Sequence, residues 1–230
     1  MKHAIFATLA ALAMAGPGAA QVIISEVHPN GSSGGAAYAA DWFELTNIGN
    51  APVNISGWSM DDDSQVPGVA PLTGVTSLLP GQSAVFLNAA STQNSVFINS
   101  WFGSNPPPGF TIGNYTGSGV GLSTGGDQVW IFDSGNAPVT AVSFGANTTL
   151  TTFDNAAGIG GATPPTPPGI SQLSSIGVNG AFVSFALVAG QPEIGSPGTI
   201  GAVPEPSSLA FAGIGAAAIW RCRRKKKRLS

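Results

Sequence analysis

Between His3 and Trp220 this chain of 230 residues contains neither lysine nor arginine. Its eight basic residues are Lys2 and seven others within residues 221–228. A body without these side chains forms no Lys or Arg salt bridges, and it excludes P-loop phosphate binding, Schiff-base chemistry and lysine isopeptide crosslinks. Positive charge confined to the two ends, beside apolar runs, is instead typical of targeting segments, because it holds an end on the cytoplasmic side of a membrane.

Cysteine is almost as scarce, and the charge that remains is acidic. The single cysteine, Cys222, lies inside the C-terminal basic run, so the body has no disulfide and no thiol chemistry. Residues 21–202 hold ten acidic residues and one histidine, His28, which gives a net charge of about minus ten. This charge excludes nucleic acid as a partner. Without cationic neighbours, the carboxylates must be solvated, accept backbone N–H groups or meet a bound cation.

The N-terminus is predicted to be a cleaved export signal. Lys2 and His3 form a short positive region, residues 4–14 are an apolar stretch, and small residues lead to a cleavage site between Ala20 and Gln21. The expected boundaries are a signal peptide at 1–20, a folded body at 21–202 and a separate C-terminal segment at 203–230.

The C-terminal segment has three parts in order. Val203, Pro204, Glu205 and Pro206 come first, and a twelve-residue apolar run follows from Leu209 to Trp220. The basic cluster comes last and consists of Arg221, Arg223, Arg224, Lys225, Lys226, Lys227 and Arg228. Twelve helical residues span about 18 Å, against a hydrocarbon core of about 30 Å. We therefore expect a single hydrophobic helix that stalls in a membrane, with the basic cluster retaining it, but does not anchor it permanently.

This tripartite tail resembles the PEP-CTERM sorting signal of bacterial exported proteins, which is named after the tripeptide at residues 204–206. The resemblance implies an exosortase as partner, a membrane enzyme that removes the tail near the tripeptide. It also implies passage through the inner membrane to the cell surface or extracellular matrix, from a membrane-anchored precursor. The alternative from the residues alone is a plain C-terminal anchor that stays uncut.

The sequence of residues 21–202 predicts a series of short strands. Period-two apolar stretches bounded by Gly, Pro and Asn predict seven of them, at 22–27, 42–47, 53–60, 83–88, 128–133, 139–144 and 182–187. This number in a chain of this size favours an antiparallel β-sandwich. Near-helical spacing of Val96, Phe97 and Trp101 adds one short helix within 91–102, covering an end of the sandwich. Residues 106–109 and 160–169 are Pro/Gly-rich loops.

Strand alternation also predicts the core. Phe43 and Leu45 point inward, whereas Trp42 and Glu44 lie on a mixed outer face. A bulge at Gly57 is expected to turn Trp58 back over the core of the 53–60 strand. The same alternation assigns further residues to the interior, namely Val53, Ile55, Val85, Leu87, Val129, Ile131, Val142 and Phe144.

Residues 22–146 carry a second resemblance, to the lamin tail domain family, in five segments: 23–27, 41–47, 53–60, 79–86 and 121–133. The family implies an immunoglobulin-like sandwich without shared catalytic residues, and its bacterial members occur as secreted or surface modules. The similarity weakens over 153–169 and resumes at 182–198 as an expected closing strand and exit turn.

One cluster has binding chemistry in it. Asp61, Asp62 and Asp63 follow a strand, repel one another and have no cation nearby, so they are a candidate calcium site, because Ca²⁺ takes six to eight oxygen ligands from loops. The alternative is a solvated loop with an Asx turn. The spacing does not match an EF-hand.

Catalysis has little support in the sequence. His28 stands alone in the body, and no nucleophile elbow accompanies it. Glu26, Glu44 and the aspartates could supply a glycosidase pair, but nothing in the sequence positions them. We therefore expect a non-catalytic protein with a structural or binding role in the matrix. The alternative is a carbohydrate-binding or hydrolytic module acting on extracellular polysaccharide, which exposed aromatic residues along one sheet face would favour.

Overall fold

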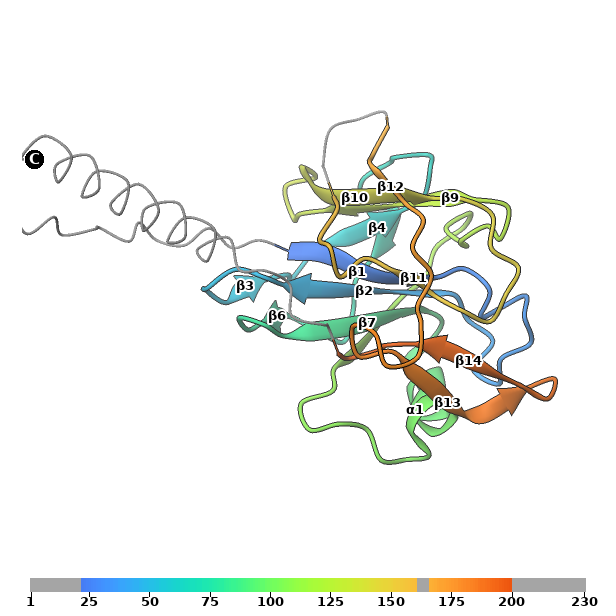
Figure 1. Cartoon of the computed structure of the whole chain (residues 1–230). Coiled ribbons are helices and arrows are strands. Elements are labelled where there is room, and N and C mark those ends of the chain that lie inside the picture. The colour runs from blue at the N-terminus through green and yellow to red at the C-terminus, as the bar shows by residue number, and fades with distance from the viewer. Residues whose placement is uncertain (1–21, 161–165, 200–230) are drawn as a thin grey trace, which may run out of the picture.

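The computed structural model describes residues 22–160 and 166–199, which form a sandwich of two five-stranded sheets and a third layer below it (Figure 1). The first sheet has the order β11-β1-β2-β7-β8, and the second has the order β12-β10-β9-β4-β5. The first contains β1 (Val22–His28), β2 (Trp42–Asn47), β7 (Ser83–Asn88), β8 (Ile112–Tyr115) and β11 (Phe153–Asp154). The second contains β4 (Ser59–Asp61), β5 (Ala70–Pro71), β9 (Asp127–Phe132), β10 (Pro138–Phe144) and β12 (Gly169–Ile170).

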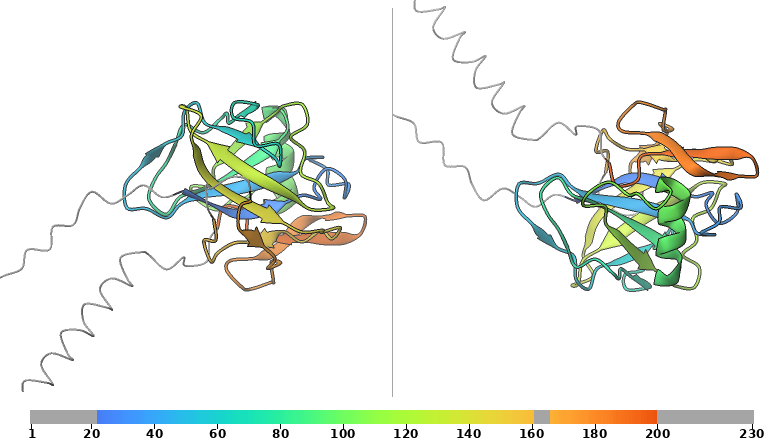
Figure 2. Two further views of the ribbon diagram at one scale, coloured as in Figure 1. Left: turned by 90° about the horizontal axis from the view of Figure 1, so that it is seen from above. Right: turned by 90° about the horizontal axis from the view of Figure 1, so that it is seen from below.

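The third layer is built from a helix and a hairpin. The short turn η1 (Ser91–Gln93) leads into α1 (Asn94–Phe102), and β13 (Phe182–Val188) pairs with β14 (Gln191–Gly195). Figure 2 shows α1 and the hairpin side by side on one face of the sandwich. A small fourth sheet pairs β3 (Val53–Asn54) with β6 (Ser77–Leu78).

The immunoglobulin-like β-sandwich predicted from the sequence is confirmed. Most neighbouring strands pair antiparallel, and two edge pairs, β7 with β8 and β10 with β12, run parallel. The space between the sheets is filled by the predicted inward residues other than Val85 and Leu87, and Phe43 is stacked there on Phe86, which was not predicted, at 5.6 Å between ring centroids. Leu45, Val129 and Val142 are fully buried there as well.

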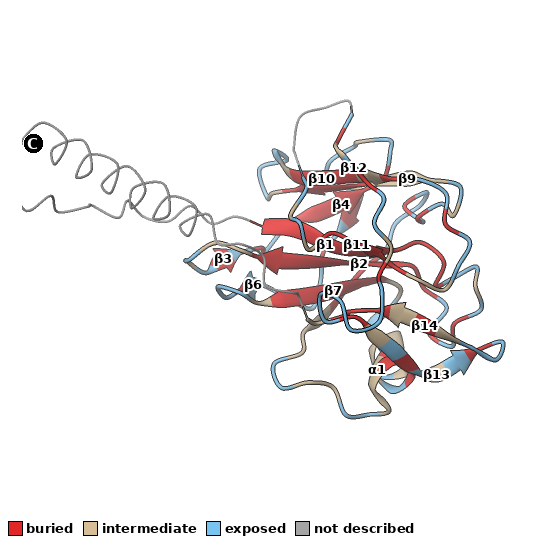
Figure 3. Cartoon of the chain, in the orientation of Figure 1, coloured by how far each residue is buried: buried red, intermediate tan, exposed pale blue. Residues whose placement is uncertain are grey.

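The outer face of the first sheet was predicted wrongly. Trp42 and Glu44 are both fully buried, because the third layer covers this face instead of leaving it to solvent. Trp42 packs edge-on against Phe97 and Trp101 of α1, so the helix lies on the face of the sheet rather than at an end of the sandwich. Figure 3 accordingly shows β1 and β2 buried along their whole length.

The pairing of β7 with β2 decides which face of the first sheet each β7 side chain occupies. Val85 and Leu87 are buried as predicted, but they lie opposite Glu44 and Trp42 and pack beneath the helix. Ala84 and Phe86 take the places between the two sheets. The sequence does not show which of these residues face the second sheet and which face the helix, because a sheet covered on both faces has apolar residues at both sets of alternating positions.

The predicted strand over residues 53–60 is two strands with a turn between them. β3 ends at Asn54 and β4 begins at Ser59, in different sheets. Gly57 has a φ of 77°, a left-handed conformation that glycine adopts without steric cost, so it makes a turn and not a bulge. The turn still brings Trp58 over the core, where its side chain is 7% exposed.

We expect Trp58→Ala to lower the free energy of unfolding by about 3 to 5 kcal/mol, because it removes a large ring from the cluster between the sheets. Urea denaturation of the variant measures the change. Leu79→Ala is the matched control, since Leu79 is 56% exposed and its truncation should leave the midpoint close to that of the parent. An unchanged midpoint for Trp58→Ala would contradict this packing.

The C-terminal part of the body differs from its predicted form. Residues 182–198 were expected to add a closing strand, but β13 and β14 form a two-stranded sheet of their own. The predicted signal peptide, the cleavage site at Ala20 and Gln21, the 203–206 motif and the 209–228 helix and basic cluster lie outside the described residues. Within the described residues, no helix has the length and apolar character needed to cross a membrane.

Candidate functional sites

An acidic cluster forms where β4 ends and β9 begins in the second sheet, with a membership that differs from the predicted one. Asp62 and Asp63 follow β4, and Asp127 opens β9 next to them, with carboxylate oxygens of all three within 4.8 Å of one another. Asp61 is directed elsewhere, because its Oδ2 accepts hydrogen bonds from Ser64 Oγ at 2.7 Å and from the Val66 N–H at 2.5 Å. The structure therefore brings together two of the three predicted residues and adds Asp127.

The electrostatics of this cluster favour a positive neighbour. Burial raises the pKa of Asp127, and the nearby carboxylates of Asp62 and Asp63 raise it further, against the lowering effect of hydrogen bonds from the Ser123 and Gln128 N–H groups. Carboxylate oxygens from two loops fit the oxygen preference of Ca²⁺. Calcium binding at Asp62, Asp63 and Asp127 stays a prediction.

If this cluster binds calcium, a concentration one hundred times the Kd should stabilise the fold by about 2.7 kcal/mol, which corresponds to a rise in Tm of roughly 5 to 10 °C. Asp127→Asn should blunt that rise. Asp61→Asn is the control, because the Asp61 carboxylate bonds to Ser64 and Val66 and not to the cluster, so this variant should keep the calcium-dependent increase. Equal melting curves in calcium and in chelator would remove the site.

His28 belongs to a closed network in the third layer. Its Nε2 lies 3.0 Å from Glu193 Oε1, and both side chains are fully buried. Tyr38 donates its hydroxyl to the same oxygen at 2.5 Å, and Trp42 packs edge-on against the imidazole at 5.6 Å. This is the one histidine–carboxylate contact among residues 22–160 and 166–199, and both of its side chains are closed off from solvent.

Glu26 and Glu44 form a second buried pair, which we call the carboxylate clasp. They are opposite each other on β1 and β2, and both point to the face covered by the C-terminal segment. Glu26 Oε1 accepts hydrogen bonds from the Ser196 N–H at 2.7 Å and from Thr152 Oγ1 at 2.5 Å. Glu44 Oε2 accepts one from the Gly198 N–H at 2.5 Å. The clasp thus ties the segment after β14 to the outer face of β1 and β2 in the first sheet.

The clasp carboxylates titrate far from their ordinary range. Burial, followed by repulsion from Glu44, raises the pKa of Glu26 from 4.5 to about 8. Burial raises the pKa of Glu44 from 4.5 to about 7, although hydrogen bonds from Ser25 and Gly198 act in the opposite direction. No lysine or arginine is present in the body to lower either value. The pair therefore holds protons at neutral pH that ordinary glutamates release.

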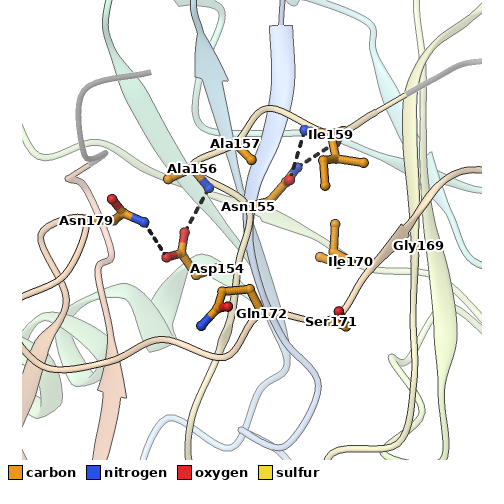
Figure 4. A pocket seen from close by; sticks show the side chains of 10 residues that line it. All are labelled: Asp154, Asn155, Ala156, Ala157, Ile159, Gly169, Ile170, Ser171, Gln172 and Asn179. Atoms are coloured by element: carbon orange, nitrogen blue, oxygen red, sulfur yellow. Dashed lines mark hydrogen bonds between the residues drawn. The ribbon is translucent and has the colours of Figure 1, made fainter. Parts of the chain in front are cut away.

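A small hollow of about 160 Å³ lies between β11 and β12 (Figure 4). Its polar side chains are engaged by neighbours, since Asp154 accepts hydrogen bonds from the Ala156 N–H and from Asn179, and Asn155 bonds to the backbone of Ile159. Sites for drug-sized ligands are usually 300–1,000 Å³ in volume. The hollow is therefore a gap in loop packing rather than a substrate pocket.

Sequence reasoning missed the two networks that hold the C-terminal segment. The signal was present in part: Glu26 and Glu44 lie in strands of a body without Lys or Arg, where backbone N–H groups are among the few partners a carboxylate can find. Which N–H groups supply these bonds depends on contacts across about 150 residues of chain, as for Glu44 with Gly198. Such long-range pairing leaves no local pattern.

Comparisons with known proteins agree with these observations. The family model described as Lamin Tail Domain matches residues 16–146, and that of the PEP-CTERM protein-sorting motif matches residues 202–225. No curated protein matches the chain. The described residues beyond the first match, 147–160 and 166–199, include the hairpin and the segment that the clasp holds.

Proposed function

Since the chain belongs to the lamin tail domain family and ends in a PEP-CTERM sorting motif, we propose that its exported form is a non-catalytic structural or binding component of the extracellular matrix. The motif makes the protein an exported one that an exosortase sorts to the cell surface, from a precursor anchored in the membrane. What we propose beyond export and sorting is the role in the extracellular matrix and the absence of catalytic turnover.

The main support for this proposal is that all described histidine and glutamate side chains, which could act as general acids or bases, are buried. Among the described residues these are His28, Glu26, Glu44 and Glu193, and none is more than 1% exposed. A general acid or base must reach the proton that it transfers, within hydrogen-bond distance of the substrate. His28 and Glu193 contact each other, and Glu26 and Glu44 accept backbone N–H groups, which supports a packing role.

The aromatic side chains bear on the polysaccharide alternative. All tryptophans and tyrosines of the described residues are buried, so their rings pack in the interior and do not form an exposed platform. Phe185 is the one aromatic residue among the exposed large hydrophobic side chains of that part of the chain. This arrangement supports a matrix component more than a module that stacks on sugar rings.

The test uses the exported protein from its host, incubated with that host's extracellular polysaccharide. We expect the protein to fractionate with the matrix and to release no reducing ends above the level of a boiled sample. Release of reducing ends that Glu26→Gln or Glu44→Gln abolishes would overturn the non-catalytic proposal and favour a glycosidase. Recovery of all the protein as free monomer in the medium would overturn the matrix role.

A further inference from the structure

Exposed apolar side chains gather on the C-terminal part of the body. Five of the exposed large hydrophobic residues lie between 176 and 187, and their exposed fractions are 64% for Ile176, 50% for Val178, 44% for Val183, 74% for Phe185 and 62% for Leu187. Figure 3 shows the corresponding exposed stretches along β13. We call these five residues the apolar face.

Three of these residues lie on β13. Val183 and Leu187 pair with Ile194 and Pro192, on either side of a shift in the register of the hairpin, and both are exposed. Phe185 lies within that shift with its ring over the end of α1, since a Cβ atom built on Gly103 would lie 2.8 Å from the ring. In a sheet with one solvated face, these outward positions are usually polar. A cluster of exposed apolar side chains of this kind marks a contact surface.

The segment that carries the apolar face adds no exposed charge of its own. From residue 155 to residue 199 the single ionisable side chain is Glu193, which is fully buried. Asp154 contacts this segment by accepting a hydrogen bond from Asn179, and it is itself buried. An anionic surface would therefore meet no exposed carboxylate from the segment itself.

The same side is where the chain leaves the fold. Val183 pairs with Ile194 of β14, and a Cβ atom built on Gly180 would lie 2.8 Å from Thr199 Oγ1, so the loop before β13 touches the last described residue. The apolar run that begins at Leu209 follows ten residues after Thr199. Ten extended residues reach at most about 33–36 Å. An anchored tail thus keeps the apolar face close to the bilayer.

We propose that the apolar face rests on the lipid bilayer while the precursor is anchored by its tail. The tether supplies a high local concentration of membrane, so that a face of a few apolar side chains can bind although it is too weak to bind alone. The occupant is the bilayer and not a second copy, because the tail fixes the membrane, and nothing else, within this distance. The proposal rests on the anchored precursor, and it adds an orientation that presents residues 203–206 at the membrane surface.

Contact with the bilayer has a consequence for release. Once the tail is removed, the tether is lost and the few apolar side chains no longer hold the domain on the membrane. Cleavage would therefore free the protein in one step, without a separate dissociation from the lipid.

The test places a fluorophore at two positions of the full-length chain in a Cys222→Ser background. Ser175→Cys puts it beside Ile176, and Ser134→Cys puts it in the β9–β10 turn of the second sheet, on the far side of the sandwich from β13 (Figure 1). The chain is reconstituted in vesicles of phosphatidylcholine and phosphatidylglycerol that contain a nitroxide-labelled lipid. We expect quenching at 175 to exceed that at 134 at least threefold.

A double variant, Phe185→Ser with Leu187→Ser, provides the decisive comparison. Both side chains are exposed, so the fold should keep its urea midpoint, and the chain should still sediment with the vesicles through its tail. Quenching at 175 should then fall to the level at 134. Equal quenching at the two positions in the parent, or quenching at 175 that the double variant leaves unchanged, would overturn the proposal.

Two further outcomes separate the competing explanations. Self-quenching between labels at 175 without quenching by lipid would assign the apolar face to a second copy and overturn the membrane contact. A full-length chain that fails to sediment with vesicles would contradict the anchored precursor, and with it this proposal. Neither outcome bears on the non-catalytic role, which the polysaccharide assay tests separately.

Discussion

Raising the pH from 5 to 9 is expected to lower the free energy of unfolding of the described domain by roughly 3 to 5 kcal/mol, which is a large part of the stability of an ordinary domain. The cause is the carboxylate clasp. Glu26 has a pKa of about 8 and Glu44 a pKa of about 7 in the folded protein, against 4.5 for an ordinary glutamate.

The direction of the change follows from proton binding. Above pH 4.5 the folded domain keeps a proton on Glu26 up to about pH 8, and one on Glu44 up to about pH 7, that the unfolded chain has released. Stability falls with pH wherever the folded state binds more protons, so the contribution is complete below pH 4.5 and is lost as pH rises through 7 and 8. The raised pKa values of Asp41 and Asp127 act in the same direction.

Urea denaturation at several pH values measures this dependence. Glu26→Gln keeps an oxygen that can accept the hydrogen bonds from Ser196 and Thr152 but has no proton to lose, so the part of the pH dependence that Glu26 contributes should disappear while that of Glu44 remains. Trp58→Ala is the matched control, because it should lower stability by the same amount at every pH. A midpoint of the parent that rises from pH 5 to pH 9 would contradict the protonated clasp.

Glu205→Ala is expected to leave nearly all of the protein uncut in the membrane fraction of a host that has the exosortase. The substitution removes the central side chain of the Pro204-Glu205-Pro206 tripeptide but leaves the apolar run and basic cluster, which are sufficient to stall the chain in the membrane. Fractionation and immunoblotting of the parent and the variant measure the effect.

Ser207→Ala is the control for this experiment, because it changes a neighbouring residue and preserves the tripeptide. It should be exported like the parent. Efficient release of Glu205→Ala into the medium would show that recognition does not depend on the tripeptide, and retention of the parent itself would indicate a plain anchor.

The strands that a sequence reading predicts well are those with a simple alternation and clear turns. β2 and β7 have the predicted bounds, 42–47 and 83–88, and the helix lies within the predicted 91–102. Residues 53–60 were misread because a turn at Gly57 and a bulge produce the same local pattern, and only the pairing of β3 and β4 with different sheets distinguishes the two.

The third layer and the clasp could not be predicted, for a different reason. Trp42 and Glu44 alternate with Phe43 and Leu45 as they would on a solvated face, and only the packing of α1 and of residues 182–198 over them makes both faces interior. The acidic cluster shows the same limit. Asp127 is far from Asp62 in sequence and joins it through the pairing of β4 with β9.

We expect the protein to leave the cell as a tail-less domain after recognition of its sorting motif. Intact mass spectrometry of the exported protein tests this directly, and intact mass is needed because trypsin has no site between Lys2 and Arg221. The expected product has its N-terminus at Gln21 and its C-terminus within residues 203–206. A stable exported or surface-bound product that retains residues 221–230 would contradict it.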